Sequence, residues 1–209
     1  MGITRHTKNF IDYYQYLTQR GKMNMEYDFE DGKGLVLAKR HVNGGGWVAS
    51  SATVDATCYI GPDAKVYGNA QVFGNARVYG NALVFDNAEV FGKAEVFDNA
   101  KVYNDAWVYG NTLVFDEAKV SGYAKVYGYA KVYGNAEVYG NAEVWGYARV
   151  YGNAKVFGNA EVWGNVKVFG DAKVFGNAKV YHDAKVFGNA KVFGDTWVYK
   201  DIDWIKNAV

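Results

Sequence analysis

The side chains most often used for catalysis are scarce in this sequence. It contains three histidines, His6, His41 and His182, and one cysteine, Cys58. A histidine that acts as a general base needs an oriented partner and a pocket, and a metal site needs clustered ligands, whereas these histidines lack ligand-like spacing. One cysteine excludes an intramolecular disulfide and any multi-cysteine metal site. No glycine-rich phosphate-binding motif occurs, so we predict no catalytic residue, no metal and no cofactor.

The overall composition describes a folded chain without a strong charge bias. Half of the 209 residues are hydrophobic, 17% are aromatic and one is a proline. The 23 basic and 22 acidic residues give a net charge of +1, which argues against nucleic-acid binding by bulk charge. The sequence shows neither an apolar stretch of about 20 residues nor the apolar core of a secretory signal. We therefore expect a cytoplasmic protein that does not bind membranes.

Apolar residues recur with a period of six over most of the chain. The unit is Val-aromatic-Gly-Asn-Ala-Lys/Glu, and its aliphatic position occurs 26 times from Val48 to Val198 without an insertion or deletion. A small residue follows four positions after nearly every aliphatic one. Such self-similarity is the signature of a repeat architecture. Cys58 occupies one of the small positions, so we interpret it as a buried space-filler rather than a nucleophile.

Each unit predicts a short strand followed by a corner. The segment Ala-Lys-Val-Tyr alternates inward small or aliphatic side chains with outward polar or aromatic ones, which is the period of a β-strand. Gly-Asn then turns the chain, because both residues tolerate a positive φ. Three units make one coil of 18 residues. The sequence therefore predicts an all-β parallel β-helix of about 8–9 triangular coils.

The open ends of such a rod would expose unpaired strand edges, so we expect a cap at each end. We predict that residues 1–46 form a small α/β cap at the N-terminus. Within it, residues 9–20 have the pattern of an amphipathic helix, and residues 25–40 have that of a β-hairpin around an Asp-Gly-Lys-Gly turn.

The other two regions follow from the same boundaries. The β-helix is predicted to span residues 47–199. Residues 200–209 are predicted to form the C-terminal cap, in which residues 201–205 make a short helix over the last coil.

The hexad V-x-x-x-A-x over residues 48–198 resembles the hexapeptide-repeat superfamily. This resemblance implies a left-handed parallel β-helix and an oligomer, commonly a trimer. The superfamily includes acyltransferases and γ-class carbonic anhydrases. The runs GGGWVA at 44–49 and YIGPDAKVYGNA at 59–70 also resemble uncharacterised hexapeptide-repeat proteins of bacteriophages and prophages.

The resemblance also defines what an enzyme of this family would need. Its acyltransferases use a histidine general base near a subunit interface, and its carbonic anhydrases hold zinc with three histidines from two subunits. Here only His182 lies in the repeat, where it replaces a corner glycine, and no loop interrupts the coils to form a cleft. We therefore expect a protein that is not an enzyme, with an acyltransferase-type activity as an alternative.

Residues 18 apart share a face, and sorting them by face distinguishes the second face from the others. It gathers tryptophan and tyrosine, the composition of an interface core. We predict that it binds protein, either another copy in a dimer or trimer or a host protein. The predicted protein-binding residues are Trp107, Tyr109, Tyr127, Tyr129, Trp145, Tyr147, Trp163 and Trp197.

The first and third faces place basic residues beside aromatic columns. One interpretation is structural, since stacked rings stabilise the coils and lysine stems cover them. The alternative is binding of a polyanion, including single-stranded nucleic acid. The candidate residues for that alternative are Lys131, Arg149, Lys167, Lys185, Tyr133 and Tyr151.

Three hypotheses for function follow from these patterns. The leading one is a non-catalytic rigid scaffold whose aromatic face binds protein; if the phage resemblance holds, the target is a host factor, for example one of a defence system. The second is a polyanion binder, and the third is an acyltransferase-type enzyme.

Overall fold

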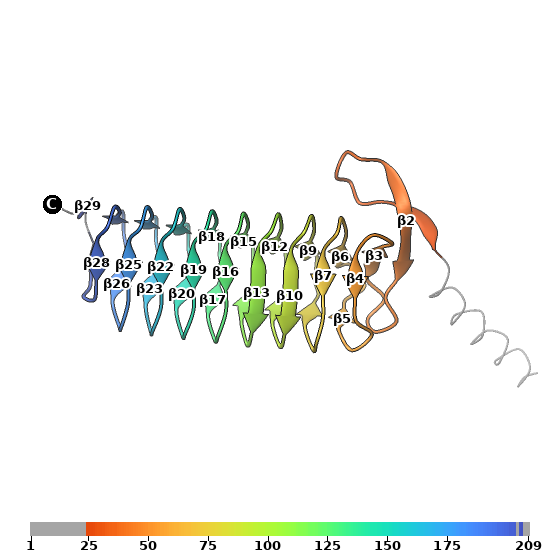
Figure 1. Cartoon of the computed structure of the whole chain (residues 1–209), viewed down its shortest axis with the longest axis horizontal. Coiled ribbons are helices and arrows are strands. Elements are labelled where there is room, and N and C mark those ends of the chain that lie inside the picture. The colour runs from red at the N-terminus through yellow and green to blue at the C-terminus, as the bar shows by residue number, and fades with distance from the viewer. Residues whose placement is uncertain (1–23, 204, 207–209) are drawn as a thin grey trace, which may run out of the picture.

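The computed structural model describes residues 24–203 and 205–206 of the chain. These residues form a rod of stacked coils with a β-hairpin at its N-terminal end (Figure 1). The helix predicted over residues 9–20 lies outside the described residues. All regular elements among the described residues are strands, and this part of the chain contains no helix long and apolar enough to cross a membrane.

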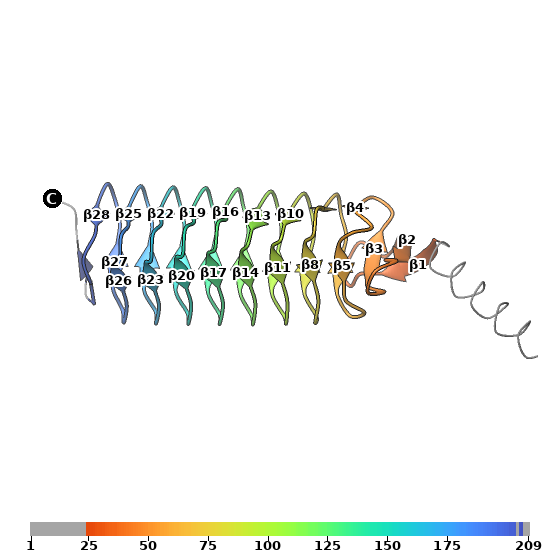
Figure 2. The same ribbon diagram turned by 90° about the horizontal axis from the view of Figure 1, so that it is seen from below.

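The strands of the rod form three sheets that run along different sides of it (Figures 1 and 2). The first sheet contains β1 (Met25–Asp28), β2 (Leu35–Arg40), β3 (Trp47–Ala49), β6 (Lys65–Val66), β9 (Leu83–Val84), β12 (Lys101–Val102), β15 (Lys119–Val120), β18 (Glu137–Val138), β21 (Lys155–Val156), β24 (Lys173–Val174), β27 (Lys191–Val192) and β29 (Ile205–Lys206). The second contains β4 (Thr53–Val54), β7 (Gln71–Val72), β10 (Glu89–Gly92), β13 (Trp107–Gly110), β16 (Lys125–Val126), β19 (Glu143–Val144), β22 (Glu161–Val162), β25 (Lys179–Val180) and β28 (Trp197–Val198). The third contains β5 (Tyr59–Ile60), β8 (Arg77–Val78), β11 (Glu95–Val96), β14 (Leu113–Val114), β17 (Lys131–Val132), β20 (Arg149–Val150), β23 (Lys167–Val168) and β26 (Lys185–Val186).

Within the rod, each strand pairs in parallel with the strand one coil away. Val48 pairs with Val66, and Val66 with Val84, so the register advances by 18 residues per coil. A parallel pair needs a long crossover connection, and here the crossover is the other two sides of the same coil. The predicted parallel β-helix is thereby confirmed as a β-solenoid of about eight turns.

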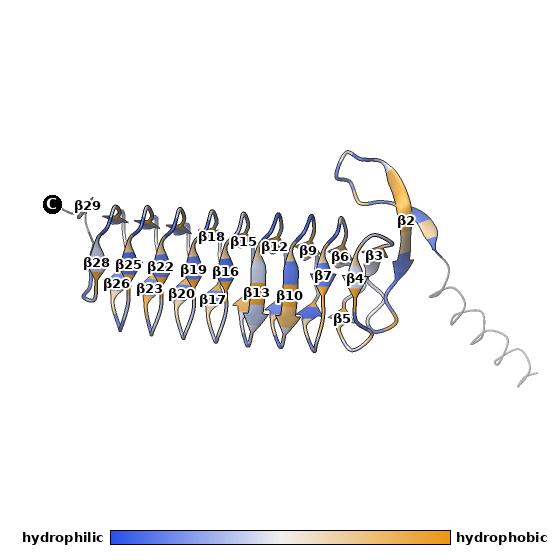
Figure 3. Cartoon of the chain, in the orientation of Figure 1, coloured by the Kyte–Doolittle hydropathy of each residue, from blue (hydrophilic) through white to orange (hydrophobic). Residues whose placement is uncertain are grey.

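The core is a column of valines and small residues. Every inward valine from Val66 to Val192 has no exposed surface, and the inward alanines between them are also buried. Figure 3 shows the resulting alternation of hydrophobic and hydrophilic residues along the coils. Burying one valine contributes about 1.5–3 kcal/mol relative to leaving it exposed, and each coil shares that burial with its two neighbours.

The corners require positive φ and a close approach of successive coils. Gly134 has a φ of 69°, and a Cβ added to it would lie 2.9 Å from the backbone nitrogen of Gly152 in the next coil. Glycine therefore occupies most of these positions. Asp86, Asp98 and Asp116 take the same conformation, which aspartate adopts more readily than most residues.

The hairpin covers the N-terminal edge of the first sheet. Strands β1 and β2 are antiparallel, and β2 continues antiparallel to β3, as the hairpin predicted over 25–40 allows. Phe29 and Ala38 are buried against the first coils, where the Phe29 ring stacks on Tyr67 at 4.8 Å. The hairpin thus pairs an edge that would otherwise attract another strand.

The predicted short helix over residues 201–205 is wrong for the residues that the structure describes there. Ile202 instead forms a parallel bridge with Val186, and β29 continues the first sheet beside β27. The cause is the exposed edge of the last coils, whose backbone groups need partners: Ile202 donates its N–H to Lys185 at 2.7 Å and accepts that of Phe187 at 3.0 Å. Ile202 is also buried, so it covers the end of the core.

Candidate binding surfaces

A continuous stack of aromatic rings runs along the second sheet. The rings project outward because they come one residue after each inward valine. From Phe73 to Tyr181 their centroids lie 4.7–5.5 Å apart, with interplanar angles of 13° or less. This second-sheet ladder consists of Phe73, Phe91, Tyr109, Tyr127, Trp145, Trp163, Tyr181 and Tyr199.

Similar ladders line the other two sheets. Tyr79, Phe97 and Phe115 stack at 4.9 Å on the third sheet, and Phe157 stacks on Phe175 at 4.9 Å on the first. Ring stacking is therefore a structural device of the whole rod, worth about 0.5–1.5 kcal/mol per pair beyond area burial. A ladder alone does not mark a binding surface.

The eight predicted protein-binding residues fall into two groups. Tyr109, Tyr127, Trp145 and Trp163 belong to the second-sheet ladder and are half-buried by stacking. The other four lie outside the ladder and are more exposed, at 41% for Trp107, 52% for Tyr129, 60% for Tyr147 and 61% for Trp197. The structure thus separates rings that hold the coils together from rings that face solvent.

Tyr129 and Tyr147 lie at the corner between the second and third sheets. Their rings stack at 5.1 Å with an interplanar angle of 11°. The same corner is occupied by Asn111 one coil before and Asn165 one coil after. The two tyrosines are therefore an aromatic insertion into a polar corner, on the same two coils as the Tyr127 and Trp145 rings of the ladder.

Most charges of the second sheet are paired with one another, and Glu89 is the exception among the described residues of its outward column. Lys125 pairs with Glu143 at 3.2 Å, and Lys179 pairs with Glu161 at 2.9 Å. The pKa of Tyr127 is raised, mainly because the phenol is buried. The nearby charge of Glu143 and the hydrogen bond that Tyr127 donates to it at 3.2 Å raise it further. Burial also raises the pKa of Tyr109, so these two phenols are neutral at physiological pH.

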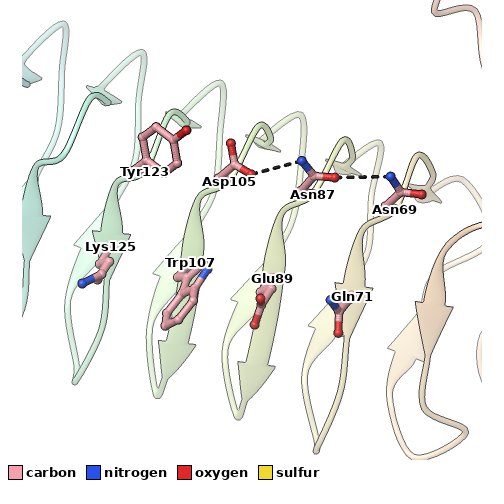
Figure 4. A pocket seen from close by; sticks show the side chains of 8 residues that line it. All are labelled: Asn69, Gln71, Asn87, Glu89, Asp105, Trp107, Tyr123 and Lys125. Carbon is pink, nitrogen blue, oxygen red and sulfur yellow. Dashed lines mark hydrogen bonds between the residues drawn. The ribbon is translucent and has the colours of Figure 1, made fainter.

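A shallow depression of about 520 Å³ lies beside Trp107, along the corner between the first and second sheets (Figure 4). Its lining residues are Asn69, Gln71, Asn87, Glu89, Asp105, Trp107, Tyr123 and Lys125. Asn69 donates a hydrogen bond to Asn87 at 3.3 Å, and Asn87 donates one to Asp105 at 3.1 Å. This chain of hydrogen bonds ends at Asp105, because a carboxylate has no N–H to donate and the residue at this position in the next coil is Tyr123.

Sequence reasoning missed this depression and the exposed Tyr123. The prediction rests on the outward strand positions of each face and does not include the corner column between two faces. The available signal was the same 18-residue sorting applied to the corner column, where Asn69, Asn87, Asp105 and Tyr123 follow one another.

The third sheet carries a column of four cations on successive coils. Lys131 pairs in register with Arg149, Arg149 with Lys167, and Lys167 with Lys185. Among the described residues, Lys185 is the member of this column that forms an ion pair, with Asp201 at 3.5 Å. Tyr133 and Tyr151 stack at 4.9 Å beside them, so the six candidate polyanion-binding residues do lie together on one face.

Of the histidines and the cysteine that the structure describes, His41 and Cys58 both adjoin the Asp55 carbonyl oxygen, whereas His182 lies several coils away. His41 is buried, and its ring nitrogens lie 3.0 Å from the Asn43 carbonyl oxygen and 3.1 Å from that of Asp55. His182 is an exposed corner residue with a φ of 61°. Cys58 is fully buried, and this burial raises the pKa of its thiol. Groups of three or more His, Cys, Asp or Glu side chains that could hold a metal ion are not found in the described part of the chain, and His6 lies outside it.

Comparison with known proteins agrees with the coiled architecture. The family described as YdcK Beta solenoid repeat matches the chain over residues 70–84 and 76–92. A search of curated proteins gave no significant match. The matched residues belong to the second and third of the stacked coils, and the same hexad continues through the rest of the rod. The repeat match and the three parallel sheets together make this chain a β-solenoid repeat protein.

Proposed function

We propose that the chain is a non-catalytic rigid scaffold that binds another protein through the aromatic surface of its second sheet. The observation that carries this proposal is the exposed Tyr129–Tyr147 stack, which lies on the same two coils as the Tyr127 and Trp145 rings of the ladder, on a sheet where most charges are paired. Exposed aromatic groups with few unpaired charges are typical of interface cores. The partner is either a second copy of the chain, in a dimer or trimer, or a host protein.

The wider setting belongs to the same proposal. On the resemblance to the hexapeptide-repeat superfamily, we propose that the coils are left-handed and triangular in section. On the resemblance to phage and prophage proteins, we propose that the chain acts in the cytoplasm of a bacterial host and that its target includes factors of a defence system.

The test replaces both corner tyrosines by the residue of the flanking coils. The variant Tyr129→Asn with Tyr147→Asn keeps a side chain that this corner already holds at Asn111 and Asn165, so the rod should fold. Native mass spectrometry of gently purified wild-type protein should show an assembly heavier than 23.2 kDa, and the double variant should appear at 23.2 kDa. Tyr123→Asn, at the opposite edge of the second sheet, is the matched control and should retain the assembly. An assembly that survives the double variant, or a wild-type protein that stays at 23.2 kDa, would contradict the proposal.

The cation column on the third sheet favours polyanion binding as a second candidate function. Asp201 offsets the charge of Lys185, but Lys131, Arg149 and Lys167 lie on successive coils and repel one another, which costs stability unless an anion lies across them. Binding to a single-stranded DNA oligonucleotide should then weaken with salt, with a slope of about −0.7 per phosphate contact. Lys167→Gln combined with Arg149→Gln should flatten that slope by about 1.4 units, because it removes two contacts. Salt-independent binding, or none, would exclude this function.

A further inference from the structure

The aromatic ladder of the first sheet is interrupted at one coil. Tyr67, Phe85 and Tyr103 stack at 4.9–5.0 Å, and Tyr139, Phe157 and Phe175 stack at 4.9 Å. Between these two runs, the outward position holds Ser121. The interruption lies over β15, near the middle of the rod (Figure 1).

The backbone is unchanged across this interruption. Lys119 pairs in register with Lys101 on one side and with Glu137 on the other. Tyr103 donates its N–H to Val120 at 3.0 Å, and Ser121 donates its N–H to Val138 at 2.9 Å. The coils therefore do not close the space left by the small side chain. The rings of Tyr103 and Tyr139 face each other across two rungs, about twice the 4.9 Å ring spacing of the ladder.

The space has a defined floor and two polar side groups. It is a slot of about 240 Å³ lined by Tyr103, Lys119, Ser121, Glu137 and Tyr139. Ser121 forms the floor and is 9% exposed. The Lys119 ammonium and one Glu137 carboxylate oxygen lie 3.8 Å apart along one side, and the other Glu137 oxygen accepts from Lys155 at 2.8 Å. This edge therefore offers the Lys119 donor and one carboxylate oxygen as acceptor.

We propose that this slot binds one planar aromatic ring, of a size between phenol and a purine, whose edge carries hydrogen-bonding groups. Inserted at the rung of Ser121, such a ring stacks on Tyr103 with one face and on Tyr139 with the other, which restores the ladder. Its polar edge meets Lys119 and Glu137. A ring without flat π-faces gains neither stacking contact. The site is on the first sheet and does not depend on the protein-binding surface of the second.

The test measures binding of three small probes by saturation-transfer NMR on the full-length chain. Phenol and adenine represent a phenolic ring and a nucleobase, and cyclohexanol matches phenol in size without being planar or aromatic. At least one of the two aromatic probes should bind with a Kd in the millimolar range, as expected for a ligand of so few atoms. Cyclohexanol should give about one-tenth of the saturation-transfer signal of that probe or less. The aromatic probe that binds identifies the ring class. Absence of binding by both, or equal binding of cyclohexanol, would overturn the proposal.

Two variants at the floor of the slot locate the bound ring. In Ser121→Tyr the new tyrosine ring fills the slot between Tyr103 and Tyr139. Saturation transfer to the probe should then fall about tenfold or more, because no space is left for it. Ser121→Ala keeps the space and should retain binding within about threefold. Ser121→Tyr should also raise the melting temperature, which shows that it folds. Unchanged binding in Ser121→Tyr would place the probe elsewhere and refute the site.

Discussion

A corner glycine offers a sharp test of what holds successive coils together. Gly152 has a φ of 71°, and a Cβ added to it would lie 3.1 Å from the nitrogen and 3.2 Å from the oxygen of Gly170. For Gly152→Ala, the left-handed conformation costs about 1–2 kcal/mol. The tight contact adds to this cost, and the reduced freedom of the unfolded chain offsets about 0.4–1 kcal/mol. We expect a net loss of about 1–2 kcal/mol in the free energy of unfolding.

Gly152→Asp is the matched variant, because aspartate already occupies this corner two coils earlier. There Asp116, with a φ of 58°, accepts the backbone N–H of Gly134 in the next coil at 2.9 Å. The new carboxylate should accept the N–H of Gly170 in the same way. Such a hydrogen bond contributes about 1 kcal/mol, so the aspartate variant should lose about 1 kcal/mol less than the alanine variant.

Urea denaturation followed by tryptophan fluorescence measures both losses, and equal m-values confirm that the same surface unfolds. Hydrogen exchange localises the effect, since the Asn153 amide bonds to the Gly170 oxygen at 2.9 Å. An alanine variant as stable as the wild type would refute the cost assigned to the corner conformation. An aspartate variant no better than alanine would refute the role assigned to the carboxylate.

Two further predictions concern the core and the pH dependence of stability. Val132 has no exposed surface, so Val132→Ala should lower the free energy of unfolding in urea by about 2–3 kcal/mol, through two lost methyl groups and the cavity they leave. A loss below about 1 kcal/mol would show that the narrow interior collapses around the gap. The pKa of Tyr67 is raised to about 12, mainly because the phenol is buried and to a smaller extent by the charges of Asp31 and Asp86. The unfolded chain loses this proton near pH 10 and the folded one only near pH 12, so this contribution to stability is complete below pH 10 and falls as the pH rises to about 12. In a titration followed by absorbance at 295 nm, Tyr67→Phe should lack one phenol that ionises near pH 12 in the wild type. If the phenol missing from the variant is one that ionises near pH 10, the raised pKa of Tyr67 is contradicted.

The solenoid could be predicted from the sequence because every coil repeats the same local physics. An inward valine, an outward ring and a Gly-Asn corner specify strand, face and turn within six residues, and the unbroken register then brings Val48 over Val66. The hairpin over 25–40 was predictable for the same reason, since its turn residues lie between two strand-forming runs.

The C-terminal segment could not be predicted in this way, because its structure depends on the unsatisfied edge of the last coil. Residues 201–205 carry no hexad, and the short apolar pattern alone does not distinguish a helix from a strand. The backbone of Lys185 and Phe187 supplies partners that favour an extended Ile202. Tertiary pairing thus overrides a weak local preference.

The division of the candidate surface into buried and exposed rings was also beyond the sequence. Trp145 and Trp107 are both outward-facing tryptophans on the second sheet, yet the first is half-buried by its neighbours in the ladder, and the second is exposed. The difference arises because the ladder column is aromatic on every coil from Phe73 to Tyr199, whereas the Trp107 column contains amide, acid, cation and indole side chains. Stacking between coils, rather than residue type, decides the exposure.

In a rod of identical coils, the positions that depart from the repeat carry the information about function. Tyr129 and Tyr147 replace the corner asparagine, which elsewhere forms hydrogen bonds between coils such as that from Asn141 to Asn159 at 3.0 Å. Ser121 gives up two stacking contacts, worth about 0.5–1.5 kcal/mol each, that a tyrosine there would make. Three successive cations of the third sheet repel one another. Each departure leaves a surface that a bound group would complete, which is the pattern expected of a binding site.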